Sequence, residues 1–213
     1  MQSAETLADS LRLGLLEMGG QTLEDGQVTA ILSYLALLQR WNKTYNLTAI
    51  KDPGQMVTRH ILDSLAILPW TGNGRLLDAG TGAGLPGVPL AIANPELDVT
   101  LLDSTGKKIR FLNHVRRELG LGNITPIQNR LESFAPPTFF DVVVSRAFAD
   151  LASFVKAAQH LARPSTRLLA MKGRYPDSEL RELPDSVRVD SIKKLTVPGL
   201  QEDRHLVIMS FIV

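Results

Sequence analysis

Cysteine is absent from this chain of 213 residues. Its absence excludes disulfides, thiolate zinc sites and cysteine nucleophiles, and it is compatible with a reducing cytoplasm. No apolar run approaches the ~18 residues that a membrane span needs. The first segment carries the acids Glu5 and Asp9 where a secretory signal would be basic. We therefore expect a cytoplasmic protein that does not associate with membranes.

An excess of one charge is also missing, because 23 Lys and Arg face 22 Asp and Glu, a formal net charge of +1. Any binding of nucleic acid must then come from a local patch. The four histidines are scattered without the spacing of metal ligands, so we expect no metal site. The hydrophobic content of 44% is normal for a globular protein with a real core, so disorder is not expected.

The pattern of apolar residues changes once along the chain. Residues 1–70 predict helices, with Leu7, Leu11 and Leu15 spaced by four and a second apolar stripe over 28–38. Later residues alternate short apolar runs with helical stretches, which is typical of a parallel sheet with crossover helices. We predict an N-terminal helical extension over 1–70 and an α/β domain over 71–213.

Seven strands are predicted in the α/β domain. They cover residues 75–79, 99–103, 124–128, 141–145, 167–171, 187–195 and 205–213. The last two are joined by a Pro198-Gly199 turn that leaves no room for a crossover helix, which predicts an antiparallel pair. A mainly parallel sheet with an antiparallel terminal hairpin is the Rossmann-like arrangement of class I methyltransferases, and classical dehydrogenases lack it.

The most informative stretch is Leu76–Gly87, in which apolar residues lead into an acid and four closely spaced glycines. It predicts a strand, a tight turn and a helix start, with Pro86 in the first helical turn. Glycine has no Cβ, so its backbone can approach a ligand closely and adopt positive φ. A nucleotide-like ligand is the expected partner of such a turn.

Two ligands fit this turn. The spacing Gly82-x-Gly84-x-x-Gly87 matches the dinucleotide fingerprint, in which a pyrophosphate sits on the helix N-terminus. Counted from Asp78, the spacing Asp-x-Gly-x-Gly-x-Gly matches the S-adenosylmethionine turn, which includes Gly80. That cofactor carries no phosphate, and an acid ahead of the glycines suits a cationic ligand, so we favour it. A nicotinamide-dependent oxidoreductase and a plain structural turn remain as alternatives.

Polar residues at the following strand ends extend the predicted cofactor site. Asp103 ends the second strand nineteen residues after Gly84, where a carboxylate can accept hydrogen bonds from both ribose hydroxyls, although it could also cap a helix. After the third strand, the backbone near Leu131 and the carboxylate of Glu132 could contact the adenine, although Glu132 could instead cap a short helix. Arg146 follows the fourth strand and suits a cofactor carboxylate, the substrate, or a surface ion pair.

A basic segment is the best candidate for contact with RNA. Residues 104–117 hold five basic side chains and no acid: Lys107, Lys108, Arg110, Arg116 and Arg117. Such a patch could bind phosphates, or it could be an ordinary solvated helix face. Lys172, at the same edge of the sheet, would extend it. Trp41 could stack on a base or dock the helical extension, and His60 and Asp63 are close enough on one helix to hydrogen-bond.

Four stretches together closely resemble the RsmG (GidB) family of bacterial ribosomal RNA methyltransferases. They are Trp41–Ile50, His60–Leu65, Leu77–Gly87 and Ser145-Arg146-Ala147, and the match runs from about residue 25 to the C-terminus. The resemblance implies transfer of a methyl group from S-adenosylmethionine to N7 of guanine 527 in 16S rRNA. The substrate would be the rRNA, the 30S subunit or an assembly intermediate, and the enzyme a monomer. By position, the family's cofactor contacts fall on Gly80, Leu85, Leu131, Glu132 and Arg146.

The implied reaction needs no general base, because N7 of guanine carries an in-plane lone pair and no proton. Catalysis would then be mainly positioning, so we assign no catalytic residue. Our own interpretation of the motifs adds Gly82 and Asp103 to the cofactor contacts. It assigns Lys107, Lys108, Arg146 and Lys172 to the RNA. A methyltransferase acting on another RNA and a non-catalytic RNA-binding module remain as alternative functions.

Overall fold

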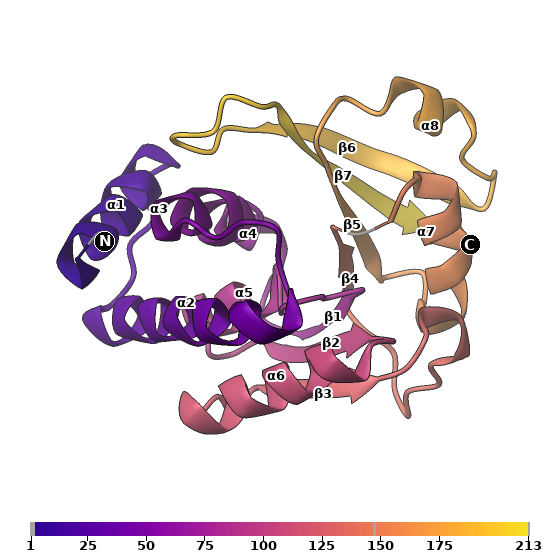
Figure 1. Cartoon of the computed structure of the whole chain (residues 1–213). Helices are drawn as coiled ribbons and strands as arrows, with labels where there is room; N and C mark the ends of the chain where they lie inside the picture. The colour runs from indigo at the N-terminus through magenta and orange to yellow at the C-terminus, as the bar shows by residue number, and fades with distance from the viewer. Residues whose placement is uncertain (1–2, 147, 213) are drawn as a thin grey trace.

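A seven-stranded sheet forms the centre of the computed structural model, which describes residues 3–146 and 148–212 (Figure 1). Ala147 and Val213 lie outside the described residues. The strands are β1 Arg75–Ala79, β2 Asp98–Asp103, β3 Ile124–Gln128, β4 Val142–Ser145, β5 Arg167–Lys172, β6 Val187–Leu195 and β7 Arg204–Phe211. All seven predicted strands are confirmed: β1, β3 and β6 have the predicted ends, and the other four differ by one or two residues at an end.

The order of the strands is β3-β2-β1-β4-β5-β7-β6. The first five pair in parallel, whereas β7 runs antiparallel between β5 and β6. The predicted parallel sheet with an antiparallel terminal hairpin is therefore confirmed. Strands β2 and β3 are added on one side of β1, whereas β4 and β5 are added on its other side. In such sheets, ligands bind outside the carboxyl ends of the strands at this reversal of the strand order, between β1 and β4.

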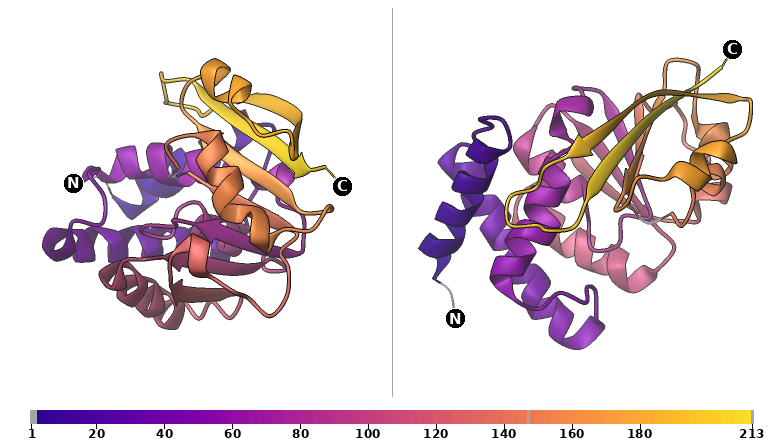
Figure 2. Two further views of the ribbon diagram at one scale, coloured as in Figure 1. Left: turned by 90° about the vertical axis from the view of Figure 1, so that its right-hand side faces the viewer. Right: turned by 90° about the horizontal axis from the view of Figure 1, so that it is seen from above.

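Helices cover both faces of the sheet. Helices α5 Gly87–Ala93 and α6 Gly106–Glu118 pack on one face, and α7 Leu151–Ala158, continued by a 3-10 turn Gln159–Leu161, packs on the other (Figures 1 and 2). The short helix α8 Asp177–Arg181 follows β5. Successive side chains of a strand point to opposite faces. In β4, accordingly, Val142 and Val144 join one apolar cluster and Val143 the other.

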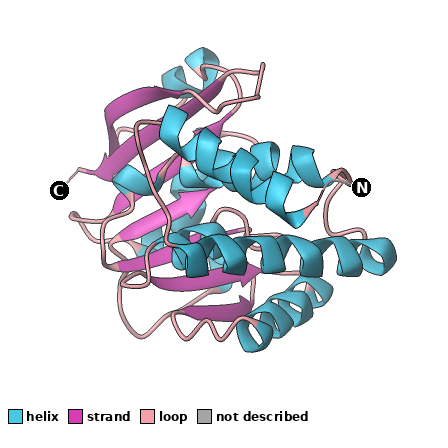
Figure 3. Cartoon of the chain, turned by 90° about the vertical axis from the view of Figure 1, so that its left-hand side faces the viewer, coloured by secondary structure: helices cyan, strands magenta, loops and turns pink. Residues whose placement is uncertain are grey.

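The N-terminal helices lie on the α5 and α6 side (Figure 3). They are α1 Ala4–Glu17, α2 Asp25–Tyr45, α3 Pro53–Met56, the π-helical turn Val57–Leu62, α4 Asp63–Leu65 and a 3-10 turn Leu68–Trp70. Their predicted helical character is confirmed. Among the helices of the described residues, none combines the length and apolar character needed to cross a membrane.

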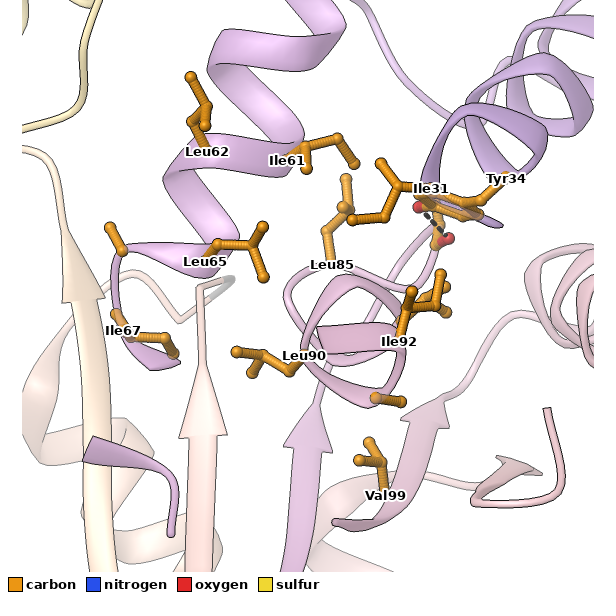
Figure 4. Close-up of a cluster of buried hydrophobic side chains, with 14 of the residues drawn as sticks. Ile31, Tyr34, Ile61, Leu62, Leu65, Ile67, Leu85, Leu90, Ile92 and Val99 are labelled. Atoms are coloured by element: carbon orange, nitrogen blue, oxygen red, sulfur yellow. Dashed lines mark hydrogen bonds between the residues drawn. The ribbon is translucent and has the colours of Figure 1, made fainter. Parts of the chain in front are cut away.

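The apolar side chains of these helices are continuous with the core above the sheet. Ile31 and Ile61 lie in the same buried cluster as Leu85 and Val99 (Figure 4). A boundary between two units at residue 70 therefore stays a prediction, because a single cluster spans both sides of it.

One buried hydrogen bond ties α2 to the glycine turn. The fully buried hydroxyl of Tyr34 donates to the carbonyl oxygen of Ala83 over 2.9 Å (Figure 4). Burial raises the pKa of Tyr34 well above its ordinary value, so the hydroxyl keeps its proton. This hydrogen bond thereby fixes the glycine turn against α2.

Replacing Tyr34 by Phe should lower the free energy of unfolding by about 1–2 kcal/mol, because the Ala83 carbonyl loses its donor in a dry environment. Tyr45→Phe is the matched control, since Tyr45 is on the same helix and is 36% exposed, and it should change stability by less than about 0.5 kcal/mol. Urea unfolding of the two variants measures both values. Equal effects of the two substitutions would contradict this role of Tyr34.

Candidate functional site

The buried carboxylate of Asp78 closes the turn after β1. One of its oxygens accepts hydrogen bonds from the Thr81 hydroxyl at 2.6 Å and from the Gly87 backbone N–H at 2.8 Å. It therefore ties the end of the strand to the first residue of α5. We expected this acid to suit a cationic ligand, but its side chain is fully buried and is directed into the protein. Pro86 stands just before α5 rather than within its first turn.

Two different constraints require glycine in this turn, namely positive φ and close packing. Gly80, Gly82 and Gly84 have φ of 73°, 62° and 100°, a region that residues with a Cβ rarely adopt. A Cβ on Gly87 would lie 2.3 Å from the Leu101 side chain, so this position is limited by packing. A Cβ on Gly82 would meet no atom closer than 4.0 Å, so its glycine serves the backbone conformation alone.

A hollow of about 320 Å³, here called the first hollow, lies at the carboxyl ends of β1 and β2 and beside the loop after β3. Four of the predicted cofactor residues line it: Gly80, Asp103, Leu131 and Glu132. Gly82 lies at its edge through a hydrogen bond to Asp103. Leu85 is separate, because its side chain is buried in the core above the sheet (Figure 4).

Asp103 holds neighbouring segments together around this hollow. Its Oδ2 accepts from the Gly82 N–H and from the Lys108 ammonium, each at 3.0 Å, and its Oδ1 accepts from the Thr105 N–H at 2.9 Å. Thr105, and not Asp103, is the N-cap residue of α6. A carboxylate has about four lone-pair sites, and three are used here. One site is left for a ligand hydroxyl, and a second becomes available if the Lys108 ammonium moves away.

Glu132 lies in a 3-10 turn, Leu131–Ser133, that follows β3. Its side chain is exposed and makes no hydrogen bond or ion pair with the described residues. The alternative that it caps this turn is therefore not supported by the hydrogen bonds. Its carboxylate is free to accept a hydrogen bond from a ligand in the first hollow.

A second hollow, of about 340 Å³, lies at the carboxyl ends of β4 and β5. Its lining residues are Ile50, Arg59, His60, Asp63, Arg146, Met171, Lys172, Gly173 and Arg204. The structure thus places Arg146 beside a different hollow from the other predicted cofactor residues. Its Nη1 atom lies 3.2 Å from Asp63 Oδ2, while Arg204 Nε lies 2.8 Å from Asp63 Oδ1.

The predicted hydrogen bond between His60 and Asp63 is replaced by other contacts. His60 Nε2 lies 2.8 Å from the Thr48 hydroxyl, and its Nδ1 lies 3.2 Å from the Arg59 carbonyl oxygen. Burial, with the nearby Arg146 cation, lowers the pKa of His60 to about 4. The imidazole is therefore neutral near pH 7, whereas Asp63 pairs with the two arginines.

Three predicted RNA-contacting lysines make contacts within the protein. Lys107 donates to the Tyr45 carbonyl at the end of α2, and Lys108 pairs with Asp103 in the first hollow. Lys172 pairs with Glu179 over 2.8 Å and lines the second hollow. Their contact with RNA stays a prediction.

The structure also shows the contacts of Trp41, for which the sequence left two roles open, and of Arg204, which the sequence did not single out. Trp41 packs against Tyr45, Phe111 and His114, which is the docking role that the sequence left open. Arg204 was missed, because the terminal hairpin offered no motif. The predicted antiparallel hairpin was the available signal, since a strand antiparallel to β5 begins near the carboxyl end of β5.

The strand order, the turn after β1 and the first hollow define the fold of S-adenosylmethionine-dependent methyltransferases. Solved structures of such methyltransferases share this fold. A methyltransferase of this type from Aquifex aeolicus superposes with a TM-score of 0.59 at 17% identity, covering 78% of this chain and 97% of that one. A glycopeptide N-methyltransferase, MtfA, complexed with S-adenosylmethionine gives 0.63 at 14% identity, covering 72% and 88%.

The sequence comparisons give the family. Residues 27–207 match the GidB family model, described as rRNA small subunit methyltransferase G. Relatives named ribosomal RNA small subunit methyltransferase G include one from Escherichia fergusonii, 48% identical over 92% of this chain and 94% of the relative. One from Yersinia pestis is 50% identical over 92% and 95%. The chain therefore belongs to the GidB family, and the predicted resemblance is confirmed.

Replacing Asp78 tests how the turn is held. Asp78→Ala removes the acceptor of two buried donors and should lower the free energy of unfolding by about 3 kcal/mol. Asp78→Asn keeps an oxygen in place and should lose much less. Urea unfolding at pH 7.5 measures both. A loss in the Asn variant as large as in the Ala variant would contradict the hydrogen-bonding role.

The same variant tests the titration of Asp78. Burial raises the pKa of Asp78 to about 6, although its two hydrogen bonds oppose this shift. Because the folded state then binds the proton more tightly than the unfolded state does, wild type gains stability as the pH falls through 6. The difference in unfolding free energy between wild type and Asp78→Asn should grow by about 2 kcal/mol from pH 7.5 to pH 4.5. A constant difference would show that Asp78 has an ordinary pKa.

Proposed function

We propose that this protein transfers a methyl group from S-adenosyl-L-methionine to N7 of a guanine, position 527, in the 16S rRNA of the small ribosomal subunit. The observation that carries the proposal is the first hollow, which gathers Gly80, Asp103, Leu131 and Glu132 in a chain of the GidB family. The relatives' names supply the rRNA of the small subunit as the substrate class.

The residues of the first hollow fit the adenosine part of this cofactor. Asp103 would accept hydrogen bonds from the two ribose hydroxyls once the Lys108 ammonium gives up its place. Glu132 would accept from the exocyclic amine, and the backbone near Leu131 would contact the ring edge. Gly80 has positive φ at the hollow's wall and leaves room for the rest of the molecule. We include Gly82 and Leu85 as parts of the turn that shape this wall.

A dinucleotide fits less well. A pyrophosphate would need free N–H groups at the start of α5, but the Gly87 N–H is already bound by Asp78 and the Gly82 N–H by Asp103. These two N–H groups are therefore not available to a pyrophosphate. This contact pattern favours S-adenosylmethionine over a nicotinamide cofactor.

The bound cofactor supplies an electrophilic methyl group, and the protein's task is to align the guanine with it. N7 loses no proton when it is methylated, so no side chain has to act as a general base. We infer that Arg146 and its neighbours hold the guanosine so that N7 lies in line, about 3 Å from the methyl carbon. The neutral His60 beside them is not needed for proton transfer.

We place the reaction in the bacterial cytoplasm, where rRNA is made, and expect a monomer to act on 16S rRNA, an assembly intermediate or the 30S subunit. Arg110, Arg116 and Arg117 on α6 are exposed and unpaired within the described residues, which supports the predicted contact of this helix with phosphates. Lys107, Lys108 and Lys172 would contribute after exchanging their present partners.

Methyl transfer to 16S rRNA from cells that lack the modification tests the function directly. We expect incorporation of a labelled methyl group, and mapping by primer extension and mass spectrometry should place it on N7 of guanine 527. Labelling of another nucleotide or another RNA would contradict the proposed specificity. Absence of any product would favour the non-catalytic alternative, and a response to NADH would favour the oxidoreductase.

The cofactor site is tested separately by Asp103→Ala, which should weaken binding of S-adenosylhomocysteine by at least about tenfold, because a charge-assisted hydrogen bond is lost. Asp98→Ala is the matched control, since this half-exposed carboxylate lies at the opposite end of the same strand. Calorimetric titration measures both affinities. Equal affinities of the two variants for S-adenosylhomocysteine would contradict a contact between the cofactor and Asp103.

A further inference from the structure

The N-terminal helices enclose a groove that shares no lining residue with the two hollows. Its volume is about 660 Å³, against about 320 and 340 Å³ for the hollows. One wall is α2 between Ala36 and Asn46, and the other consists of Leu7 from α1, Lys51 and the two ends of α3. In Figure 1, α1 and α3 lie next to each other on one side of α2. We call this space the helical groove.

The wall that α2 contributes is one face of the helix, because its lining residues recur every three or four positions. Ala36, Gln39, Lys43 and Asn46 follow this spacing. Trp41 lies on the opposite face, where it packs against Phe111 of α6. The packing of α2 on the core therefore leaves the groove face open to a ligand.

Three cations line the helical groove, and no Asp or Glu is among the described residues that line it. The cations are Arg40, Lys43 and Lys51. All three are exposed, and none has a hydrogen bond or an ion pair within the described residues. Asp52 adjoins Lys51, but its Oδ1 accepts the Gln55 N–H as the N-cap of α3. The groove therefore has a local net positive charge in a chain whose total charge is only +1.

The groove also offers uncharged hydrogen-bonding groups on a firm floor. The side-chain amides of Gln39 and Asn46 make no hydrogen bond within the described part of the chain. Asn42 ties α2 to the following loop, because it donates to the Thr48 carbonyl and accepts from the Thr48 N–H, each over 2.9 Å. Met56, which is fully buried, forms part of the floor. This shape exists before any ligand arrives, which lowers the entropy lost on binding.

The helical groove adjoins the methyltransferase site. Lys51 lines the groove, while its neighbour Ile50 lines the second hollow. At the end of α2, the Tyr45 carbonyl accepts from Lys107 in the first turn of α6, and the N-cap of α6, Thr105, lines the first hollow. A long substrate that places one unit at the hollows can therefore extend into the groove.

A nucleic-acid backbone is the ligand that this chemistry favours. Arg and Lys bind phosphate oxygens, and side-chain amides bind phosphate and sugar oxygens. An apolar segment of a protein would instead remove three cations from water without giving them a partner, which is unfavourable.

We propose that the helical groove binds the phosphodiester backbone of the substrate RNA to one side of the target guanosine. Arg40, Lys43 and Lys51 contact the phosphates, and Asn42 positions the loop that leads to Lys51. This inference rests on the proposed function, because it takes RNA to be the substrate. It gives the N-terminal helices a task, namely to extend the RNA-binding surface beyond α6.

Lys43→Ala tests the groove through the salt dependence of RNA binding. Affinity for an unmodified 16S rRNA transcript is measured by filter binding over a range of KCl concentrations. Loss of one phosphate contact should reduce the slope of log affinity against log salt by about 0.7–0.9. Adding Arg40→Ala should double this reduction. Affinity for S-adenosylhomocysteine should not change, since neither residue lines a hollow.

Lys156→Ala is the matched control. Lys156 is also an exposed lysine in the last turn of a helix, but its helix, α7, covers the other face of the sheet. Its slope should equal that of wild type, and Lys43→Arg, which keeps the charge, should keep the slope. A Lys43→Ala slope equal to that of Lys156→Ala would overturn the proposal. So would a matching fall in cofactor affinity, since the substitution would then disturb the cofactor site.

The kinetics of methylation give a second readout. Because the groove holds nucleotides away from the reacting N7, the variant that carries both Arg40→Ala and Lys43→Ala should have a higher KM for RNA. Its kcat at saturating RNA should equal that of wild type. A lower kcat with an unchanged KM would contradict a role of the groove in binding RNA.

The 30S subunit distinguishes RNA from a ribosomal protein as the occupant of the groove. A defect of the double variant on 30S subunits without any defect on the naked transcript would assign the groove to an acidic protein and overturn the proposal. Equal defects on both substrates would support RNA.

The methylation assay separates this proposal from the function on which it rests. A wild type that binds the transcript but does not methylate it would contradict the proposed function, while the Lys43→Ala slope would still report whether the groove binds RNA. Methylation of guanine 527 with an unchanged Lys43→Ala slope would leave the function standing and overturn the RNA groove alone.

Discussion

The buried carboxylate of Asp78 is the contact on which the rest of the site depends. By accepting from Thr81 and Gly87, it fixes how β1 turns into α5. That turn presents the Gly82 N–H to Asp103 and the Ala83 carbonyl to Tyr34. A carboxylate kept away from water is costly unless it is hydrogen-bonded, so the turn and the carboxylate stabilise each other.

The two hollows lie at the carboxyl ends of the parallel strands. The first uses the ends of β1 and β2 and the loop after β3, which all belong to the parallel part of the sheet. The second needs the antiparallel strand β7 and the N-terminal helices, because Arg204 and Asp63 come from them. The first hollow is therefore built from the parallel part of the sheet, and the second from elements added around it.

The strands and the antiparallel pairing of the last two could be predicted because short apolar runs and a missing crossover helix are local signals. The glycine turn was predictable for the same reason, and so were Asp103 and Glu132 at the strand ends. The direction of a side chain was harder to predict. Asp78 has the sequence position of a ligand contact, yet its environment turns it inward, and burial of Leu85 depends on helices far away in the chain.

Partnerships between distant residues were beyond sequence reasoning. Asp63 and Arg204 are separated by 141 positions, and their ion pair forms only because β7 is inserted beside β5. Some partners closer in the chain were not predicted either: Lys108 faces Asp103, and His60 binds Thr48 rather than Asp63. Charge runs and helical spacing indicate available groups, whereas the fold selects their partners.

The central claim is that the first hollow holds the adenosine part of the cofactor. A crystal structure of the protein with S-adenosylhomocysteine tests it most directly. We predict that the ribose hydroxyls bind Asp103, that the adenine lies beside Leu131 and Glu132, and that Asp78 keeps its contacts with Thr81 and Gly87. Adenosine bound instead between Arg146 and Arg204 would contradict the account.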